Sequence, residues 1–245
     1  MAVFRITGGR KLHGDLYPQG AKNEALQILS AVLLTKEAVV VKNVPKIRDV
    51  MNLIELLMSL GVKVTQLKSN DYKFQADDVN LDYLTSKEFQ EKSKTLRGSI
   101  MLVGPLLARF GKGFISSPGG DKIGRRRLDT HFIGFQKLGA QFAFDKETST
   151  FTVSADHLKG TYMLLDEASV TGTANIVMAA VLAEGTTTIY NAACEPYVQQ
   201  LCKMLKHILP MLKQKLLIQI HEWIIFLITQ QNYRLLLREP RLFLP

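Results

Sequence analysis

The chain has 245 residues, 47% of them hydrophobic and 22% charged, which is an ordinary composition for a folded protein of one or two domains. Its formal net charge of +9 suggests an anionic partner, and composition alone does not choose between a nucleic acid, a lipid surface and a small polyanion. No apolar run reaches the roughly 18 residues needed to cross a bilayer, and no basic start followed by an apolar run marks a signal peptide.

Three segments of the chain share one pattern, in which an apolar helix rich in small residues is followed by a polar turn, a short β-branched strand and a turn that contains proline. They cover residues 21–45, 96–120 and 172–196, and their matching leucines are almost evenly spaced: Leu34, Leu107 and Leu182. Even spacing of a whole supersecondary unit indicates internal duplication. The first helix of each unit is apolar on nearly every side, so we expect it to be buried.

Each of the first two units continues into a second helix and a further strand. Asp49 is placed to cap the second helix of the first unit, which ends at Gly61, and Asp129 is placed to cap a helix that ends at Gly139. Both helices end in Leu-Gly and lead into a strand of alternating polar and apolar residues. The pattern therefore predicts an α/β protein with helices inside and sheets outside.

The third unit departs from this pattern after its proline, Pro196. Residues 206–245 contain no Gly, Ala, Val or Asp, so no Leu-Gly pair ends the second helix. We expect this tail to be foreign to the fold, as a shifted reading frame or a truncated gene model would produce; an amphipathic helix that binds a membrane surface or a partner is the alternative. The two cysteines, Cys194 and Cys202, do not make a disulfide framework and indicate reduced thiols in a cytoplasmic protein.

The segment Ser117–Asp129, SPGGDKIGRRRLD, carries the strongest signal for binding chemistry. Its two glycines let backbone amides approach an anion closely, and the arginines that follow match phosphate and carboxylate oxygens with paired donors. Asp121 directly follows the glycines, where it can supply a proton to a bound substrate. An arginine triplet alone is more typical of a solvated surface or of a nucleic-acid contact, but beside the glycines and the acid it favours a small-anion site.

Two further basic residues lie where the first helices of units one and two begin. Lys22 and Asn23 follow Gly20, and Arg97 occupies a comparable place in unit two. Helix N-termini attract anions through unpaired amides and the helix dipole, so a cation there is unfavourable unless an anion binds. A bound phosphate explains these basic residues, and an exposed surface position explains them equally well.

Taken together, these motifs resemble the UDP-N-acetylglucosamine 1-carboxyvinyltransferases, a family of enolpyruvyl transferases. The resemblance covers residues 3–205 and rests on GAKNEAL at 20–26, Thr-Leu-Arg at 95–97, LARFGKGFISSPGGDKIGRRRLDTH at 107–131 and EASVTGTA at 167–174. It implies an inside-out α/β barrel, in which one domain holds three βαβαββ-like repeats with buried helices. Residues 1–20 are then a strand segment of a second domain, 21–205 the domain with the catalytic loop, and 206–245 a tail without a counterpart in the family.

The resemblance also implies a reaction, in which the enolpyruvyl group of phosphoenolpyruvate moves to the 3-hydroxyl of UDP-N-acetylglucosamine and phosphate leaves. This is the first committed step of peptidoglycan precursor synthesis, and it uses no metal or cofactor. Asp121 would be the proton donor, and Lys22 and Asn23 would contact phosphoenolpyruvate. The other residues expected to line the UDP-sugar and phosphate site are Arg97, Arg126, Arg127, Leu128, Asp129, Thr130, Glu167, Ala168, Ser169 and Val170.

Two positions depart from the family pattern. Many members carry cysteine, which the epoxide fosfomycin alkylates, where Asp121 stands, and lysine is common where Glu167 stands. Because the family's site lies between two domains, we expect this chain alone to be an inactive or weakly active fragment. Two alternatives stay open: a fragment of the related transferase that acts on shikimate 3-phosphate, and a basic nucleic-acid-binding module, which the lack of aromatic residues among the arginines disfavours.

Overall fold

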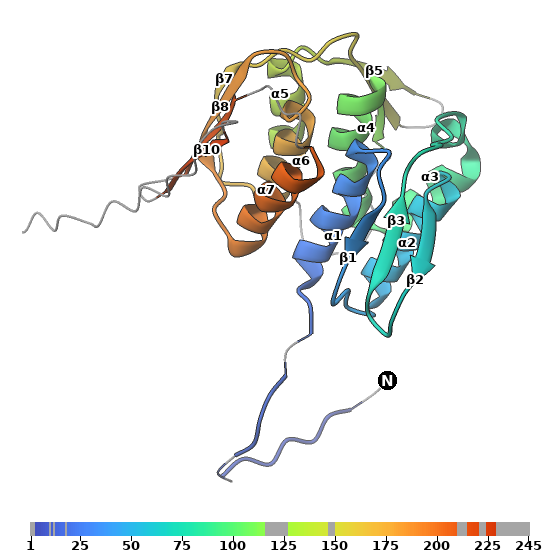
Figure 1. The fold of residues 1–245 in the computed structure, drawn as a ribbon, viewed down its shortest axis with the longest axis vertical. Helices are drawn as coiled ribbons and strands as arrows, with labels where there is room; N and C mark the ends of the chain where they lie inside the picture. The colour runs from blue at the N-terminus through green and yellow to red at the C-terminus, as the bar shows by residue number, and fades with distance from the viewer. Residues whose placement is uncertain are drawn as a thin grey trace, which may run out of the picture.

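The structure is a computed structural model that describes residues 3–9, 11, 13–17, 19–115, 127–146, 150–209, 215–220 and 224–228. Figure 1 shows helices gathered in the middle of the molecule and small sheets around them. The N-terminal segment runs away from this body below α1 (Lys22–Ala31), and its large apolar side chains are between 86% and 91% exposed. Among the described residues, no helix is both long enough and apolar enough to cross a bilayer.

The first repeat folds as a helix, a strand, a second helix and two more strands. After α1 come η1 (Val32–Leu34), β1 (Val39–Val41), α2 (Arg48–Ser59), β2 (Lys63–Gln66) and β3 (Tyr72–Gln75). The strand order is β1-β3-β2, and β3 is antiparallel to both of its neighbours. The apolar residues of α2 recur every three or four positions, so one face of it is buried: Val50, Leu53, Ile54, Leu56 and Leu57.

The second repeat has the same topology. Its elements are η3 (Arg97–Leu102), α4 (Val103–Phe110), β4 (Lys112–Ile115), α5 (Asp129–Lys137), β5 (Gln141–Asp145) and β6 (Thr150–Ser154). The strand order β4-β6-β5, with β6 antiparallel to both neighbours, matches that of the first repeat. Two short helices join the two repeats: η2 (Asp82–Thr85) and α3 (Lys87–Thr95).

The third repeat differs in its sheet. Its elements are β7 (Tyr162–Leu164), α6 (Val170–Ala180), β8 (Thr186–Ala192), α7 (Pro196–Ile208), β9 (Lys215–Ile220) and β10 (Ile224–Ile228). The strand order is β10-β9-β8-β7, and β8 is parallel to both of its neighbours. Strands occupy 215–220 and 224–228, so the alternative of an amphipathic helix there is wrong. The predicted divisions at residues 20 and 205, and the foreign origin of the tail, stay predictions.

Backbone geometry repeats from one unit to the next. Gly61 and Gly139 end α2 and α5 with left-handed φ angles of +94° and +98°. In each case the amide of the following residue bonds back to a carbonyl of the last helical turn, at 3.1 Å for Val62 and 2.9 Å for Ala140. These matching turns confirm the Leu-Gly helix ends that the sequence predicts.

The predicted helix caps at Asp49 and Asp129 are wrong. The residue before α2 is Ile47 and the residue before α5 is Leu128, and neither supplies a side-chain cap. Both aspartates lie in the first helical turn, where the helix dipole favours a carboxylate, and both pair with basic side chains.

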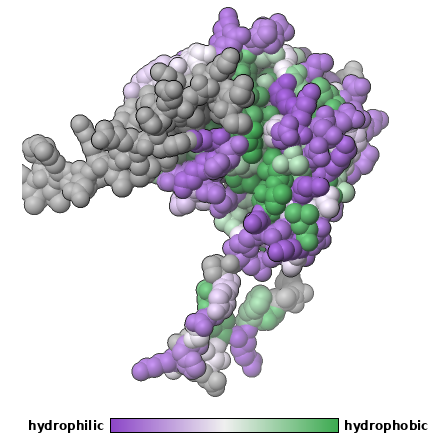
Figure 2. All heavy atoms as spheres, viewed as in Figure 1, coloured by the Kyte–Doolittle hydropathy of each residue, from purple (hydrophilic) through white to green (hydrophobic). Residues whose placement is uncertain are grey.

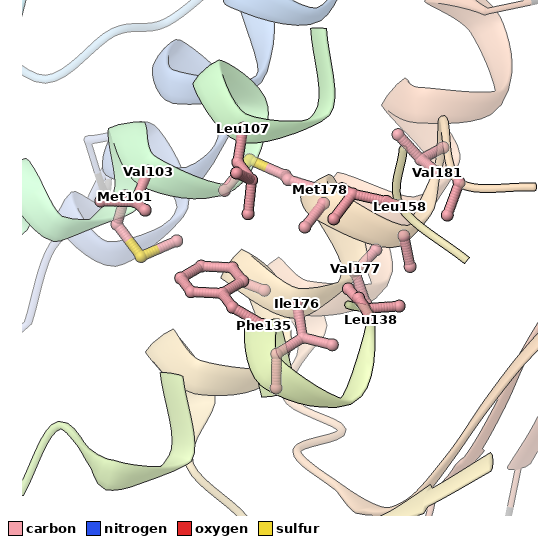
Figure 3. Close-up of a cluster of buried hydrophobic side chains, with 14 of the residues drawn as sticks. Met101, Val103, Leu107, Phe135, Leu138, Leu158, Ile176, Val177, Met178 and Val181 are labelled. Carbon is pink, nitrogen blue, oxygen red and sulfur yellow. The ribbon is translucent and has the colours of Figure 1, made fainter. Parts of the chain in front are cut away.

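The first helices of the repeats are buried, as predicted. In α6 every residue from Gly172 to Ala180 is buried, and in α1 the same holds from Ala25 to Ala31. Figure 3 shows the side chains of η3, α4, α5 and α6 turned toward one another around Phe135. Gly104 brings α4 so close to α6 that a side chain at this position would collide with the backbone of Asn175.

Candidate functional site

The starts of several helices lie close together, because the strand that follows each helix returns the chain toward the same end. Lys22 at the start of α1 pairs with Asp49 at the start of α2, with 2.9 Å between Nζ and Oδ2. Gly98, at the start of η3, packs against the side chain of Leu26 in α1. First helical turns present unpaired N–H groups and the positive end of the helix dipole, so this end of the molecule is suited to an anion.

The start of α5 is bonded to the segment that precedes α6. Arg127 donates from Nη2 to Asp166 Oδ2 at 3.0 Å, and from Nε to Asp129 Oδ2 at 2.5 Å. The hydroxyl of Thr130 lies 3.2 Å from Glu167 Oε1 and 3.4 Å from Asp166 Oδ1. These bonds join parts of two different repeats into one surface.

We call residues 127–130 and 166–169 the interlocked segments. The hydrogen bond that Arg127 donates to Asp129, together with the charges of Asp129 and Asp166, raises the pKa of Arg127, so its guanidinium stays positively charged. Ser169 caps α6, where its Oγ accepts from the amide of Gly172 at 3.2 Å. The remaining residues of the expected UDP-sugar contact set in this region lie at the same place: half-buried Leu128 before α5, exposed Ala168, and half-buried Val170 as the first residue of α6.

The other expected contact residues stand nearby at the starts of α1 and η3. Asn23 is exposed in the first turn of α1, beside Lys22. Arg97 is half-buried as the first residue of η3, and its charge acts on His131 of α5. The ion pair of Lys22 runs to Asp49, so the structure ties this lysine to the first repeat and not to the interlocked segments.

A buried polar network lies directly behind the interlocked segments. Asn175 donates from Nδ2 to the carbonyl of Ile100 at 2.7 Å and to His131 Nδ1 at 3.0 Å, while its Oδ1 accepts a backbone amide of α4 at 2.8 Å. Because His131 Nδ1 accepts, the ring proton is on Nε2, which lies 3.3 Å from the hydroxyl of Thr171. Burial, and to a smaller degree the charge of Arg97, lowers the pKa of His131 to about 4. The imidazole is therefore neutral at pH 7 and links α5 to α6, while Asn175 extends the network to η3.

Two of the predicted site residues lie outside the described residues. They are Asp121, the expected proton donor, and Arg126, an expected substrate ligand, both within 116–126. Their roles stay predictions.

Four residues of this region were not predicted from the sequence. Asp49 was expected only as a helix cap, and Asp166, His131 and Asn175 were not considered. Asp166 directly precedes the EASVTGTA motif and His131 ends the RLDTH motif, so their neighbours along the chain are the only signal that the sequence offers. Their partners lie in other repeats, which a reading of local patterns does not reach.

A pocket of about 400 Å³ lies on another side of α1, between β1 and α7. Its lining includes Gly20, Glu24, Ile28, Gln200 and Met204, and none of the predicted site residues is among its lining residues. Figure 2 shows an apolar strip between hydrophilic flanks on the face of the molecule where α1 and β1 lie. Because none of the predicted site residues lines this pocket, we place the candidate site at the helix starts instead.

The helix starts combine groups that suit a phosphorylated sugar. Guanidinium and ammonium groups and helix N–H groups bind phosphate oxygens. Carboxylates accept hydrogen bonds from sugar hydroxyls and base edges, and side-chain hydroxyls both donate and accept them. Within the described ranges, no group of three or more His, Cys, Asp or Glu side chains is arranged to hold a metal ion. The arrangement therefore fits substrate binding through charge and hydrogen bonds.

Comparison with known proteins gives a consistent result. The family model for EPSP synthase (3-phosphoshikimate 1-carboxyvinyltransferase) matches residues 6–215. Proteins named UDP-N-acetylglucosamine 1-carboxyvinyltransferase are 62% identical in Bacteroides thetaiotaomicron and 64% identical in Bacteroides fragilis, each over 205 residues. In both cases 84% of this chain matches 47% of the relative, so the chain spans about half the length of the curated relatives it matches.

Solved structures confirm the predicted fold. The enolpyruvyl transferase NikO from Streptomyces tendae superposes with a TM-score of 0.68 at 16% identity, over 81% of this chain and 45% of that one. An EPSP synthase from Acinetobacter baumannii gives 0.57 at 15% identity, over 76% and 42% of the two chains. Fold, repeats and family model agree, and the chain belongs to the EPSP synthase (3-phosphoshikimate 1-carboxyvinyltransferase) family of enolpyruvyl transferases.

Proposed function

We propose that this chain is the part of a UDP-N-acetylglucosamine 1-carboxyvinyltransferase that binds the nucleotide sugar and carries the catalytic loop. The observation that carries the proposal is the pair of interlocked segments, where Arg127 and Thr130 meet Asp166 and Glu167 at the starts of two helices. Relatives with 62–64% identity carry this enzyme name, which makes the nucleotide sugar the favoured ligand of that surface.

In the proposed reaction, the 3-hydroxyl oxygen of UDP-N-acetylglucosamine adds to carbon 2 of phosphoenolpyruvate and gives up its proton to a base or to solvent, while carbon 3 takes a proton from an acid. The tetrahedral intermediate then loses phosphate and a proton from carbon 3, and the enol ether remains on the sugar. Asp121 is the proposed donor of the first proton, and Lys22, Asn23 and Arg97 are the proposed contacts to the charged phosphoenolpyruvate. The positive charges of Lys22 and Arg97 balance the negative charge that this substrate brings.

The proposed place of the reaction is the cytoplasm, in peptidoglycan precursor synthesis, and hence in cell-wall formation, cell shape and cell division. This follows from the nucleotide sugar as acceptor. It would not hold if the acceptor were a different molecule.

The test is to incubate the purified chain with phosphoenolpyruvate and UDP-N-acetylglucosamine, to measure phosphate release, and to measure binding of the nucleotide sugar by calorimetry. Because the chain spans about half of its relatives, we expect binding of the nucleotide sugar with little or no turnover. A chain that binds no nucleotide sugar would contradict the proposal.

The second candidate is a part of an enzyme that acts on shikimate 3-phosphate, and the name of the matching family model favours it. Shikimate 3-phosphate carries one phosphate and no nucleoside. The same calorimetric titration with this compound separates the two candidates, since binding of shikimate 3-phosphate without binding of the nucleotide sugar would favour the second.

A further inference from the structure

Asp166 joins the two interlocked segments through both of its carboxylate oxygens. Oδ2 accepts from Arg127 Nη2 at 3.0 Å, and Oδ1 lies 3.4 Å from the hydroxyl of Thr130. Asp166 stands before the first turn of α6, whereas Arg127 lies just before α5 and Thr130 lies in its first turn. One side chain of the third repeat thus contacts two residues of the second.

The contacts of Asp166 are not duplicated by its neighbour. Thr130 has one hydroxyl proton, and it is shared between Asp166 and Glu167, whose Oε1 is slightly closer at 3.2 Å. Arg127 donates to two carboxylates, Asp166 and Asp129, and Asp129 lies on the same segment as the arginine. Asp166 is therefore the residue through which the third repeat holds the guanidinium.

The exposure of this ion pair indicates that it contributes little to folding. The side chain of Arg127 is 54% exposed and that of Asp166 is 36% exposed. Ion pairs between such solvated side chains contribute little to stability, and the long arginine loses side-chain entropy when it is held. What the pair does fix is direction, because a planar guanidinium bound at two of its nitrogens has one orientation.

We propose that Asp166 is a positioning residue, which aligns Arg127 and Thr130 with the first turn of α6 and thereby sets the affinity for the nucleotide sugar. This inference rests on the proposed function of the interlocked segments. A binding surface made from two repeats is effective only when its donors are held in register, and misplacement of such groups by about 1 Å weakens recognition strongly.

The experiment compares Asp166→Ala, Asp166→Asn and the unchanged chain in calorimetric titrations with UDP-N-acetylglucosamine. We expect Asp166→Ala to raise Kd about tenfold, the effect of losing a hydrogen bond to a charged group. Asp166→Asn should have a smaller effect, because its amide oxygen still accepts from Thr130 while its amide nitrogen cannot accept from Arg127. Asp156→Asn, an exposed acid in the loop after β6, is the matched control with unchanged Kd.

Two further measurements, of melting temperature and of hydrogen exchange, separate a loss of alignment from unfolding and from a failure of the proposed function. The melting temperature of each variant should stay within about 2 °C of the unchanged chain, so that a change in Kd reports alignment and not unfolding. Hydrogen exchange of the amides of Thr130 and His131 should become faster in Asp166→Ala and not in Asp156→Asn. If the unchanged chain binds no nucleotide sugar, the proposed function fails, and faster exchange at these amides still supports the alignment by Asp166. Unchanged exchange, or unchanged Kd in Asp166→Ala, would overturn the inference.

Discussion

At the scale of single residues, the fold strongly sets the protonation state of His131. Its ring is 1% exposed, and both ring nitrogens meet neutral partners, Asn175 and Thr171. Burial lowers the pKa to about 4, from 6.5 for an ordinary histidine, so the fold binds the neutral form. Neutral His131 lets Asn175 serve two elements at once, which a protonated ring would prevent because it could no longer accept a hydrogen bond.

The first prediction concerns the pH dependence of stability. Because the folded-state pKa of His131 lies below the unfolded value, its contribution is complete above pH 6.5 and is lost progressively as the pH falls from 6.5 toward 4. The loss is on the order of 3 kcal/mol at the lower end of this window. Denaturant unfolding at pH 7.5 and pH 4.5 measures it, and His131→Gln should show a smaller loss than the unchanged chain. The exposed His157→Gln is the control and should behave like the unchanged chain. Equal acid sensitivity of His131→Gln and His157→Gln would contradict this account.

The second prediction concerns the chemistry of Asp121. The family resemblance implies that fosfomycin alkylates a cysteine at this position in many members, and a carboxylate is a much weaker nucleophile toward an epoxide than a thiolate. We expect intact-mass spectrometry to find no adduct on the chain after incubation with the drug. An adduct mapped to Asp121 would contradict the prediction, whereas one on Cys194, which is exposed, would report an unrelated thiol reaction.

At the scale of elements, the repeats explain why helices end where they do. Gly61 and Gly139 occupy equivalent helix ends with almost equal left-handed φ angles, +94° and +98°. Their surroundings differ, since a Cβ at Gly61 would lie 2.5 Å from the carbonyl oxygen of Asp78, whereas at Gly139 the nearest atom, the carbonyl oxygen of His157, is 3.8 Å away. The two glycines therefore have the same backbone conformation but different room for a Cβ, so they can be compared as a matched pair.

The third prediction uses this pair. Gly139→Ala should lower the free energy of unfolding by about 1 kcal/mol, the cost of a left-handed conformation for a residue with a Cβ. Gly61→Ala carries the same cost and also the collision with Asp78, and should lose roughly 1–3 kcal/mol more. Urea unfolding of the two variants measures both values. A Gly139→Ala variant as unstable as Gly61→Ala would show that the collision is relieved by movement of the backbone.

Elements were more predictable than contacts between them. The helix–strand pattern, the buried first helices and the Leu-Gly ends follow from periodicity and glycine placement within each unit, and the structure confirms them. The caps at Asp49 and Asp129 were wrong because both residues lie inside the first helical turn, where their carboxylates pair with Lys22 and Arg127. Such partners are set by packing, which local patterns do not specify.

The candidate site was predictable to the same extent. The resemblance placed 127–130 and 167–170 in one site, and the structure brings the two segments together. Asp166 and the His131–Asn175 network were not predicted because each joins side chains from different repeats. No spacing along the chain reveals such a pair.

At the scale of the whole molecule, the chain corresponds to about half of the length of its curated relatives. It matches 47% of its curated relatives, so the groups that a full-length enzyme would supply from its other part are not among these residues. The end with the helix starts brings together donors and acceptors from two repeats. At the opposite end, α4, α5 and α6 finish near residues 155–157. These residues serve as an internal control, because we expect no ligand to bind there.

The most direct test of the account is a titration of the isotopically labelled chain with UDP-N-acetylglucosamine, followed by amide NMR. We predict that the shifts concentrate at residues 127–130 and 166–171, the interlocked segments and the first turn of α6, while residues 155–157 stay unchanged. Shifts that are confined to other parts of the molecule, or no shifts at saturating nucleotide sugar, would contradict the claim that the helix starts bind this substrate.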